Sequence, residues 1–436
     1  MRILILKSLE RFWREKLKNL KIDPLTRVEG LGRVYLRERE GRYEFVRLEI
    51  YEAPRFFEKL VVGKKPNQVL DIVARICGLC PVAYQITASE AFERIFEIKI
   101  PEHIYKLRRA LYLGEWISSH SAHVFFLHLP DFFKKESFIE LAKEKKNILE
   151  IGLYIRKTGN RVIDVIGGRH VHPVNLKVGG FYTMPEEKDV ESLLKEIEVA
   201  VEKAEEALEL VISLEYPEIE LDYEFISLYS GELYPIVEGE IKSSKGWKIK
   251  KEDYEKFFEE YQEPHSTALY SRIKNGKFYL VGPLSRFNNN FHNLDVNIVK
   301  KLKGIYPIKN PFMSIIPRVV EILYGFREIL KILTSIDLKQ EPSVEWKPKE
   351  GEGLGVTEAP RGILYHKYTV DEKGKVLQAK IVPPTSQNQG IMEETLYHVL
   401  NKVKPENPLE VSEKVVRTFD PCISCATHFL NVVRLP

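Results

Sequence analysis

The sequence predicts a mainly α-helical protein with α+β additions, in which a core of long helices carries small β-sheets at its periphery. Two observations support this class. Long segments have apolar residues at helical spacing and lack internal proline, and shorter segments of alternating residues lie between them. With 436 residues, 44% of them hydrophobic, the chain can form one large core. We therefore expect one domain over residues 21–436, preceded by an extension over residues 1–20.

The first half of the chain predicts one hairpin followed by helices. Residues 1–20 are expected to form an amphipathic helical extension, and residues 30–52 a hairpin that turns at Glu40-Gly41. A helix is expected to start at Pro66-Asn67 and to resume after a Cys-x-x-Cys motif until about Phe96. Further helices are predicted over residues 103–129, 136–160 and 187–214, the last with the clearest amphipathic pattern.

The second half returns to short strands before its helices. Residues 222–285 contain β-prone runs and a predicted hairpin at Asn275-Gly276. A helical pattern covers residues 311–337, and residues 361–382 alternate as a second strand pair. Helices at about 390–402 and 408–417 lead to a C-terminal cysteine motif.

Composition excludes several classes of protein. The net charge of +3 with 30% charged residues gives no reason to expect nucleic-acid binding or an anionic membrane surface as partner. No window of about 18 apolar residues predicts a membrane-spanning helix. We see no signal-peptide pattern at the N-terminus, so a cytoplasmic location is expected. Abundant Lys, Glu and Ile are typical of a thermophile.

All four cysteines of the chain lie in two Cys-x-x-Cys pairs, Cys77 with Cys80 and Cys422 with Cys425. Two such pairs can offer four thiolates to a metal, or they can act as redox dithiols. A structural zinc site usually closes a short loop, whereas these pairs stand near opposite ends of the chain. This separation favours a buried active-site metal, and thiolates select zinc, iron, copper(I) or nickel. Neither pair has the βαβ context of a thioredoxin-like protein.

Further motifs accompany the two pairs in a recognisable order. They are Thr26-Arg-Val-Glu-Gly30, His120-x-x-His123 with Leu129-Pro-Asp131, Gly167-Gly-Arg169 with His172-Pro173 and Gly179-Gly180, Glu358-Ala-Pro-Arg-Gly362, and Pro384-Thr385-x-x-Asn388. Together with Arg75-x-Cys-Gly-x-Cys80 and Asp420-Pro-Cys-x-x-Cys-x-x-His428, they resemble the large, catalytic subunit of nickel–iron hydrogenases over nearly the whole chain. The resemblance implies that family's fold and the reaction H2 ⇌ 2H⁺ + 2e⁻.

The resemblance also implies the metals. All four cysteines would bind nickel, and Cys80 and Cys425 would also bridge to an iron that carries carbonyl and cyanide ligands. The pocket around these diatomic ligands would be formed by Pro383, Pro384 and Thr385. Glu58 and His428 would bind a separate magnesium ion, which prefers oxygen ligands and keeps several waters. A solvated helix carboxylate remains the alternative for Glu58.

Four residues would take part in catalysis. Glu29 matches the family's proton-transfer glutamate, although a lone glutamate is more often a surface or capping carboxylate, and Cys422 is the other candidate first proton acceptor. Arg361 would lie over the open metal position, on a loop that Pro360 restrains. Asp420 would orient Arg361 by hydrogen bonding. We expect His120 and His123 to pack and to hydrogen-bond near the cluster rather than to bind a metal.

Departures from the commonest pattern of the family indicate a branch. Tyr84 and Leu31 stand where histidine is frequent, and Ser119 stands where many members carry an acid. These residues resemble the cytosolic NAD(P)-linked branch, including the alpha subunits of sulfhydrogenases, whose complexes could also reduce sulfur. The chain has no further cysteine motif for an iron–sulfur cluster and no strand followed by Gly-x-Gly-x-x-Gly. An iron–sulfur small subunit and flavin/NAD(P)H diaphorase subunits are therefore expected as partners.

Family resemblance further implies a maturation protease that cuts after His428, which would remove residues 429–436, together with nickel-insertion factors. Two other readings remain open at this point. A subunit of the type that forms the quinone site of respiratory complex I shares the fold but lacks the four cysteines. A protein with a structural four-cysteine zinc site would contain zinc alone.

Overall fold

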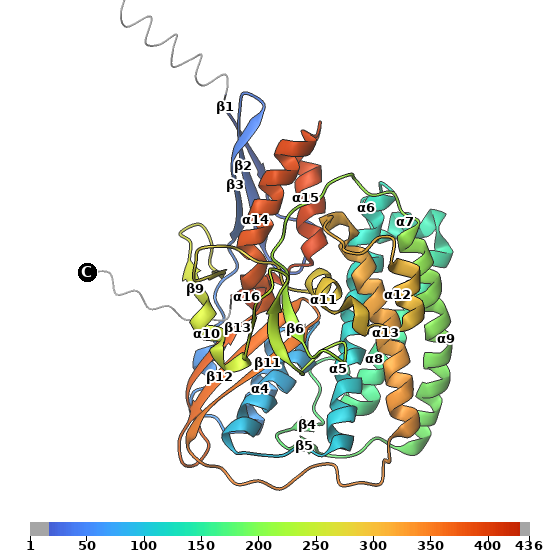
Figure 1. Ribbon diagram of the computed structural model, residues 1–436, viewed down its shortest axis with the longest axis vertical. Coiled ribbons are helices and arrows are strands. Elements are labelled where there is room, and N and C mark those ends of the chain that lie inside the picture. The colour runs from blue at the N-terminus through green and yellow to red at the C-terminus, as the bar shows by residue number, and fades with distance from the viewer. Residues whose placement is uncertain (1–16, 428–436) are drawn as a thin grey trace, which may run out of the picture.

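A computed structural model describes residues 17–427 of the chain (Figure 1). A bundle of four long helices forms the right-hand side of the molecule in this view: α5 (Glu102–Ser121), α8 (Lys146–Gly167), α9 (Glu187–Ile212) and α13 (Ile315–Ser335), which pack side by side. Each helix buries an apolar stripe, as the spacing of Ile151, Ile155, Val162 and Ile166 on α8 illustrates. The predicted long-helix core is confirmed.

The cysteine pairs follow two other groups of helices. The chain runs through α3 (Pro66–Val73) and a 3-10 turn, η1 (Ala74–Ile76), before α4 (Pro81–Ile95) begins. Near the C-terminus, α14 (Pro384–Val403) and α15 (Pro408–Phe419) precede the short α16 (Ile423–Ala426). Helix α14 begins six residues before the predicted start at about residue 390, because Pro384 occupies its first position, where a missing N–H costs nothing.

The N-terminal sheet is antiparallel and consists of β1 (Leu17–Ile22), β2 (Gly32–Arg39) and β3 (Arg42–Ile50). The hairpin predicted over residues 30–52 is confirmed. The helical prediction for residues 1–20 is wrong at residues 17–20, which pair with β2 because Leu20 and Ile22 align with the buried face of that strand. Residues 1–16 lie outside the described part of the chain.

A second antiparallel sheet contains β11 (Gly351–Ala359), β12 (Gly362–Val370) and β13 (Val376–Val382). The strand pair at 361–382 was predicted, but β11 was not, and the segment expected as a loop is a tight hairpin. Only Pro360 and Arg361 separate the two strands; we call them the β11–β12 turn. A Cβ on Gly355 would lie 2.0 Å from the backbone oxygen of Thr87, so glycine lets β11 lie directly on α4.

Residues 222–285 form two small sheets. One contains β6 (Ile226–Tyr229), β7 (Glu240–Ser243) and β8 (Lys248–Ile249); the other pairs β9 (Phe258–Gln262) with β10 (Leu269–Ile273). The hairpin predicted at Asn275-Gly276 is only a turn after β10, since the paired strands are joined by residues 263–268 instead. Gly276 has φ of 88°, which explains the strong turn signal.

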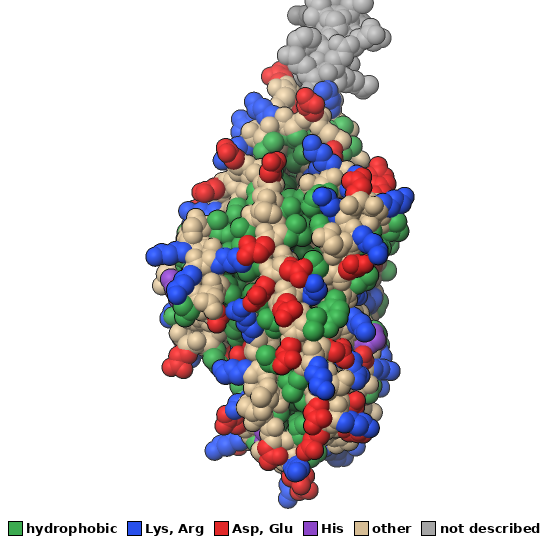
Figure 2. All heavy atoms as spheres, turned by 90° about the vertical axis from the view of Figure 1, so that its right-hand side faces the viewer, with side chains coloured by type: hydrophobic (Ala, Val, Ile, Leu, Met, Phe, Trp, Pro, Cys, Tyr) green, Lys and Arg blue, Asp and Glu red, His purple; other side chains and the backbone are tan. Residues whose placement is uncertain are grey.

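The remaining elements are short or peripheral. They are α2 (Phe57–Leu60), a π-helix (Ala122–His128), α6 (Leu129–Phe132), α7 (Phe138–Glu144), β4 (Leu176–Lys177), β5 (Gly180–Phe181), η3 (Lys251–Asp253), α10 (Tyr254–Phe257), α11 (Pro283–Asn290), η4 (Phe291–Asn293), α12 (Val296–Leu302) and η5 (Pro311–Ser314). Figure 2 shows basic and acidic side chains interspersed over the face that α9 helps to form. Within residues 17–427, no helix has the length and apolar content needed to cross a membrane.

Candidate metal centre

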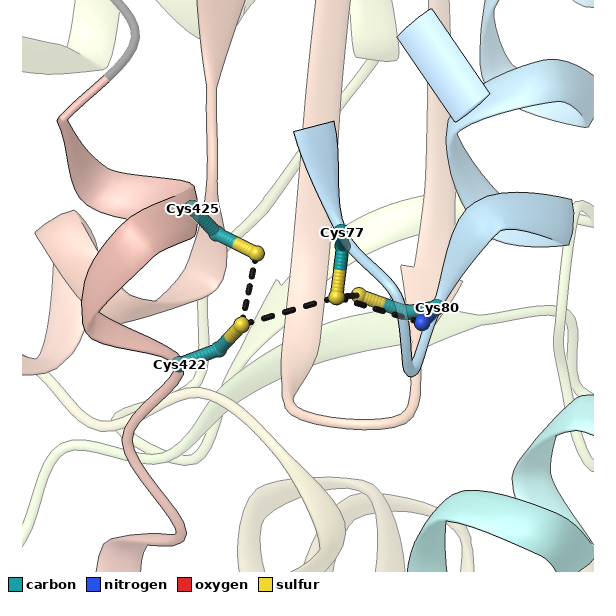
Figure 3. A group of neighbouring side chains, drawn as sticks. All are labelled: Cys77, Cys80, Cys422 and Cys425. Atoms are coloured by element: carbon teal, nitrogen blue, oxygen red, sulfur yellow. Dashed lines mark hydrogen bonds between the residues drawn. The ribbon is translucent and has the colours of Figure 1, made fainter. Parts of the chain in front are cut away.

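The four cysteines meet in one buried cluster (Figure 3). Cys77 and Cys80 come from the loop between η1 and α4, and Cys422 and Cys425 from the start and the body of α16. Their Sγ atoms lie within 4.8 Å of one another. The Sγ atom of Cys77 lies 2.6 Å from that of Cys80 and 3.5 Å from that of Cys422. The Sγ atoms of Cys422 and Cys425 are 2.7 Å apart. No side chain of the four is more than 4% exposed.

The four neighbouring thiols change one another's pKa values. Burial raises the pKa of Cys80 and of Cys425, and the adjacent sulfurs raise the pKa of Cys422. Burial also acts to raise the pKa of Cys77, but hydrogen bonds with the other cysteines and the charge of Arg361 lower it overall. Four thiolates in so small a buried space need a cation to balance them, and a soft metal ion fits this donor set.

A buried glutamate holds the loop of the first pair. Cys80 gives α4 no side-chain cap. Glu115 of α5 accepts hydrogen bonds from the N–H groups of Val82 at 2.5 Å and Ala83 at 3.0 Å, so it caps the helix from outside. Glu115 has no exposed surface, and burial raises its pKa. Glu115 was not predicted, because a single glutamate within a helix belongs to no motif.

Other elements hold the second pair. Thr385, at the start of α14, accepts a hydrogen bond from the Cys422 N–H at 3.0 Å. The carboxylate of Glu29 accepts one from the Ser424 N–H at 3.1 Å, and its backbone oxygen accepts one from Ile423 at 3.1 Å. Glu29 is half-buried. Two residues selected from the sequence, Glu29 and Thr385, therefore lie directly beside the C-terminal cysteines.

Arg361 and Asp420 form the contact that the resemblance implied. The guanidinium of Arg361 donates to the backbone oxygen of Asp420 at 2.7 Å and to its carboxylate at 3.1 Å. It also donates to the Ser119 hydroxyl at 3.2 Å. Burial acts to lower the pKa of Arg361, but Asp420 and the thiolates, Cys422 foremost, raise it well above its usual value. Arg361 thus stays positively charged beside the cysteines.

Four further predicted or noted residues have clear positions. Pro383 and Pro384 precede Thr385 at the N-terminus of α14. Tyr84 is buried, its hydroxyl has no hydrogen-bond partner within the described residues, and burial together with the thiolates raises its pKa. Glu58 on α2 accepts a hydrogen bond from the Ile381 N–H at 2.7 Å. His428, its predicted partner at a magnesium site, lies outside the described residues.

His120 and His123 hydrogen-bond separately. His120 contacts the Glu321 carboxylate at 2.7 Å, and His123 contacts the Arg417 backbone oxygen at 2.7 Å. Among residues 17–427, the four cysteines are the one group with metal-binding geometry. The expectation that the histidines pack and hydrogen-bond is confirmed.

The chain is similar in sequence to known hydrogenases. The family model described as nickel-dependent hydrogenase matches residues 55–150 and 321–428. Sulfhydrogenase 1 subunit alpha of Pyrococcus furiosus is 35% identical over 426 residues, which cover 95% of this chain and 98% of the relative. The NAD-reducing hydrogenase HoxS subunit beta of Cupriavidus necator is 25% identical over 476 residues, covering 96% of each chain.

A solved structure confirms the predicted fold. An NAD+-reducing [NiFe]-hydrogenase in the H2-reduced state matches with a TM-score of 0.87 and 26% identity, covering 94% of this chain and 99% of the other. The relatives and the four-cysteine cluster together argue against a complex I type subunit or a structural zinc protein. The chain belongs to the nickel-dependent hydrogenase family.

Proposed function

We propose that this chain is the catalytic large subunit of a cytosolic nickel–iron hydrogenase, which cleaves H2 reversibly into protons and electrons. One observation carries the proposal: in a member of this family, four buried thiols from opposite ends of the chain converge within 4.8 Å. Four thiolates from two Cys-x-x-Cys pairs are suitable ligands for a soft or borderline metal ion such as nickel.

The cysteines would hold the metals. Cys77, Cys80, Cys422 and Cys425 would bind nickel, and Cys80 and Cys425 would bridge to iron with carbonyl and cyanide ligands. When bound, this centre supplies the position at which H2 is split heterolytically. Pro383, Pro384 and Thr385 begin α14 beside Cys422, where they would provide apolar walls and one hydroxyl around the diatomic ligands.

Glu29 would carry the proton away from the centre. Its carboxylate accepts a hydrogen bond from the backbone between Cys422 and Cys425. Glu29 is only half-buried, so part of it is accessible to solvent. A carboxylate within hydrogen-bond reach of the reacting groups can relay a proton. The thiolate of Cys422 is the alternative first acceptor. Glu29 would then receive the proton from the sulfur.

Arg361 would supply a fixed positive charge over the open metal position. Asp420 and Ser119 hold its guanidinium at three points, so the charge need not reorganise when H2 arrives. Because Ser119 is neutral, Asp420 is the one carboxylate among these three contacts, and Arg361 keeps more of its positive charge available.

Electrons would leave through partner subunits. All four cysteines of the sequence belong to the metal cluster, so none remains to bind an iron–sulfur cluster. An iron–sulfur small subunit would accept the electrons, and flavin subunits would pass them to NAD(P). Gly78, between the first two cysteines, is exposed, so a partner could approach the cluster at this point. Nickel-insertion factors and a maturation protease acting after His428 complete the proposed partners.

A separate magnesium site would involve Glu58 and His428. Glu58 is half-buried and accepts a backbone hydrogen bond at 2.7 Å from β13, which restrains its carboxylate. Magnesium needs one or two carboxylate or imidazole ligands besides its waters. Magnesium content before and after Glu58→Ala, at constant nickel content, would test this site.

Infrared spectroscopy of the anaerobically purified complex tests the proposal. We expect carbonyl and cyanide stretching bands, about one nickel per chain, and H2 oxidation with a redox dye. A matched Cys422→Ser complex should lose the bands and the nickel together. Zinc alone, without infrared bands, in a fully assembled and folded complex would overturn the proposal.

A further inference from the structure

A buried arginine that no sequence motif marks lies behind the β11–β12 turn. Arg286, on α11, has no exposed surface, and its guanidinium stacks over the Trp116 ring at 4.3 Å from the centroid. Its Nε and Nη2 donate to the two carboxylate oxygens of Glu321 at 2.8 and 2.7 Å. Nη1 donates to Glu358 at 3.0 Å. Two carboxylates therefore hold the guanidinium plane in one orientation.

The remaining donors of Arg286 reach the β11–β12 turn. Nη1 donates to the backbone oxygen of Ala359 at 2.8 Å, and Nη2 donates to that of Pro360 at 2.9 Å. An arginine has five N–H groups in a rigid fork. All five find an acceptor here, and two of the acceptors are the carbonyl oxygens directly before Arg361.

Backbone packing completes the restraint. A Cβ on Gly282, just before α11, would lie 2.8 Å from the backbone oxygen of Arg361. A Cβ on Gly362 would lie 2.8 Å from the Gly282 nitrogen. The start of α11 thus touches the turn without side chains between them. Any displacement of the turn must break its bonds to Arg286 or overlap this backbone.

We propose that Arg286 is a positioning residue, which holds the β11–β12 turn so that the guanidinium of Arg361 is directed at the four-cysteine cluster. This inference rests on the proposed function, in which Arg361 acts beside the metals. The side-chain hydrogen bonds of Arg286 end on Glu321, Glu358 and the backbone oxygens of Ala359 and Pro360, not on a cysteine or on Asp420. Its influence on the cluster therefore passes through the turn.

Stability alone poorly explains why Arg286 is buried with two carboxyl groups, one of which, that of Glu358, has its pKa raised by burial to about 7. Burying an arginine and two carboxylates costs desolvation energy, and well-packed apolar side chains of similar volume often serve as well. Burial acts to raise the pKa of Glu321, but Arg286 lowers it to about 2, so the pair is ionised at neutral pH. A planar cation with five directed donors gives the turn one position, which apolar packing would not specify.

Arg286→Lys in the complete enzyme complex tests the inference. Lysine keeps the charge, but its three donors on one nitrogen cannot reach both carboxylates and both carbonyl oxygens. We expect kcat for H2 oxidation to fall about tenfold or more, since small misplacements of reacting groups are costly. The KM for H2 and the nickel content should stay within about twofold of wild type.

Arg108→Lys is the matched control. Arg108 pairs with Glu93 through two bonds of 2.9 and 2.7 Å and is also buried, at 7% exposed, yet none of its hydrogen bonds in the described chain involves the β11–β12 turn. Its kcat should equal that of wild type. An equal loss of kcat in both variants would show that any buried arginine matters in this way, and would overturn the positioning role.

A double variant separates positioning from general damage. In an Arg361→Lys background, Arg286→Lys should lower kcat no further, because the group that it positions is already lost. Multiplied losses, or wild-type kcat in Arg286→Lys with full nickel content, would overturn the inference. An inactive wild-type complex with full nickel content would instead overturn the proposed function.

Glu358→Gln serves if Arg286→Lys fails to accumulate with nickel. This change leaves the Arg286–Glu321 pair intact. It also keeps a side-chain oxygen at position 358, which can still accept the hydrogen bond of 2.7 Å from the Leu228 N–H. We expect a smaller loss of kcat, about threefold, which again disappears in the Arg361→Lys background. Persistence of the loss in that background contradicts the inference.

Discussion

The two cysteine pairs are held in different ways. Cys77 and Cys80 precede α4, a helix of 15 residues that belongs to the core, and Glu115 caps this helix from α5. Cys422 and Cys425 lie on α16, a helix of four residues. The second pair depends on hydrogen bonds to elements far away in the sequence, supplied by Thr385, Glu29 and Arg55.

This difference divides the cluster into a preorganised half and a docked half. We infer that the first pair would keep most of its geometry if the second were absent, because α4 packs against α5 and β11. A helix of four residues cannot persist without such support. The predictions that follow test whether the halves behave differently, from the largest expected effect to the smallest.

Removing one thiolate should abolish metal binding in either half. For Cys77→Ser and for Cys425→Ser we expect nickel content and H2 oxidation to fall by more than about a hundredfold, since even outer partners of a metal site cost up to that much. Elemental analysis and dye-coupled activity of the purified complex measure both. Nickel retained in either variant would mean that the two halves do not share one metal.

Glu115→Ala should damage the preorganised half. The change leaves the N–H groups of Val82 and Ala83 buried without an acceptor, at a cost of about 4 kcal/mol of unfolding free energy. Urea unfolding of the full-length chain measures it. Glu115→Gln, which keeps one acceptor, should lose less than half as much. Equal stability of wild type and Glu115→Ala would show that α4 needs no cap.

Acid should weaken the same half through His120, on the helix that carries Glu115. Burial lowers the pKa of His120 to about 4, although Glu321 opposes this. Between about pH 6.5 and 4 the unfolded chain then binds more protons than the folded one, so stability is complete above pH 6.5 and falls with pH, by about 3 kcal/mol. His120→Gln should flatten this dependence in urea titrations. A dependence as steep as in wild type would exclude His120 as its source.

Thr385→Val should loosen only the docked half. It removes the acceptor of the Cys422 N–H without changing the side-chain volume, at a cost of about 1 kcal/mol. Hydrogen exchange should increase over residues 420–427 and stay unchanged over α4. Faster exchange in both segments would show that the two halves unfold as one unit.

The parts of the molecule that depend on residue spacing could be predicted from the sequence. The bundle helices and the β2–β3 hairpin follow from periodicity. The cysteine pairs, together with Arg361 and Asp420, were found as motifs, and the structure brings these groups together. Strand β11 was not predicted, because glycines at positions 351, 353 and 355 weaken the strand pattern. Position 355 requires glycine because the backbone of β11 contacts the backbone of α4 there. This contact belongs to the tertiary structure and leaves no local pattern in the sequence.

The supporting groups could not be found in this way. Glu115 and Arg286 act on residues more than a helix away in sequence, and neither belongs to a pattern with a period. An isolated Glu or Arg in a helix is more often a surface residue. Only the packing of α5 against α4, and of α11 against the β11–β12 turn, gives these two side chains their roles.

The backbones of Glu29 and Cys422 pair in an isolated parallel β-bridge, which has a consequence for the order in which the protein is assembled during translation. Glu29 leaves the ribosome 393 residues before Cys422. The four helices of the bundle can pack while translation continues. The four-sulfur cage is incomplete until Cys422 and Cys425 have emerged, so a metal ion that arrives before them meets only the two thiols of Cys77 and Cys80.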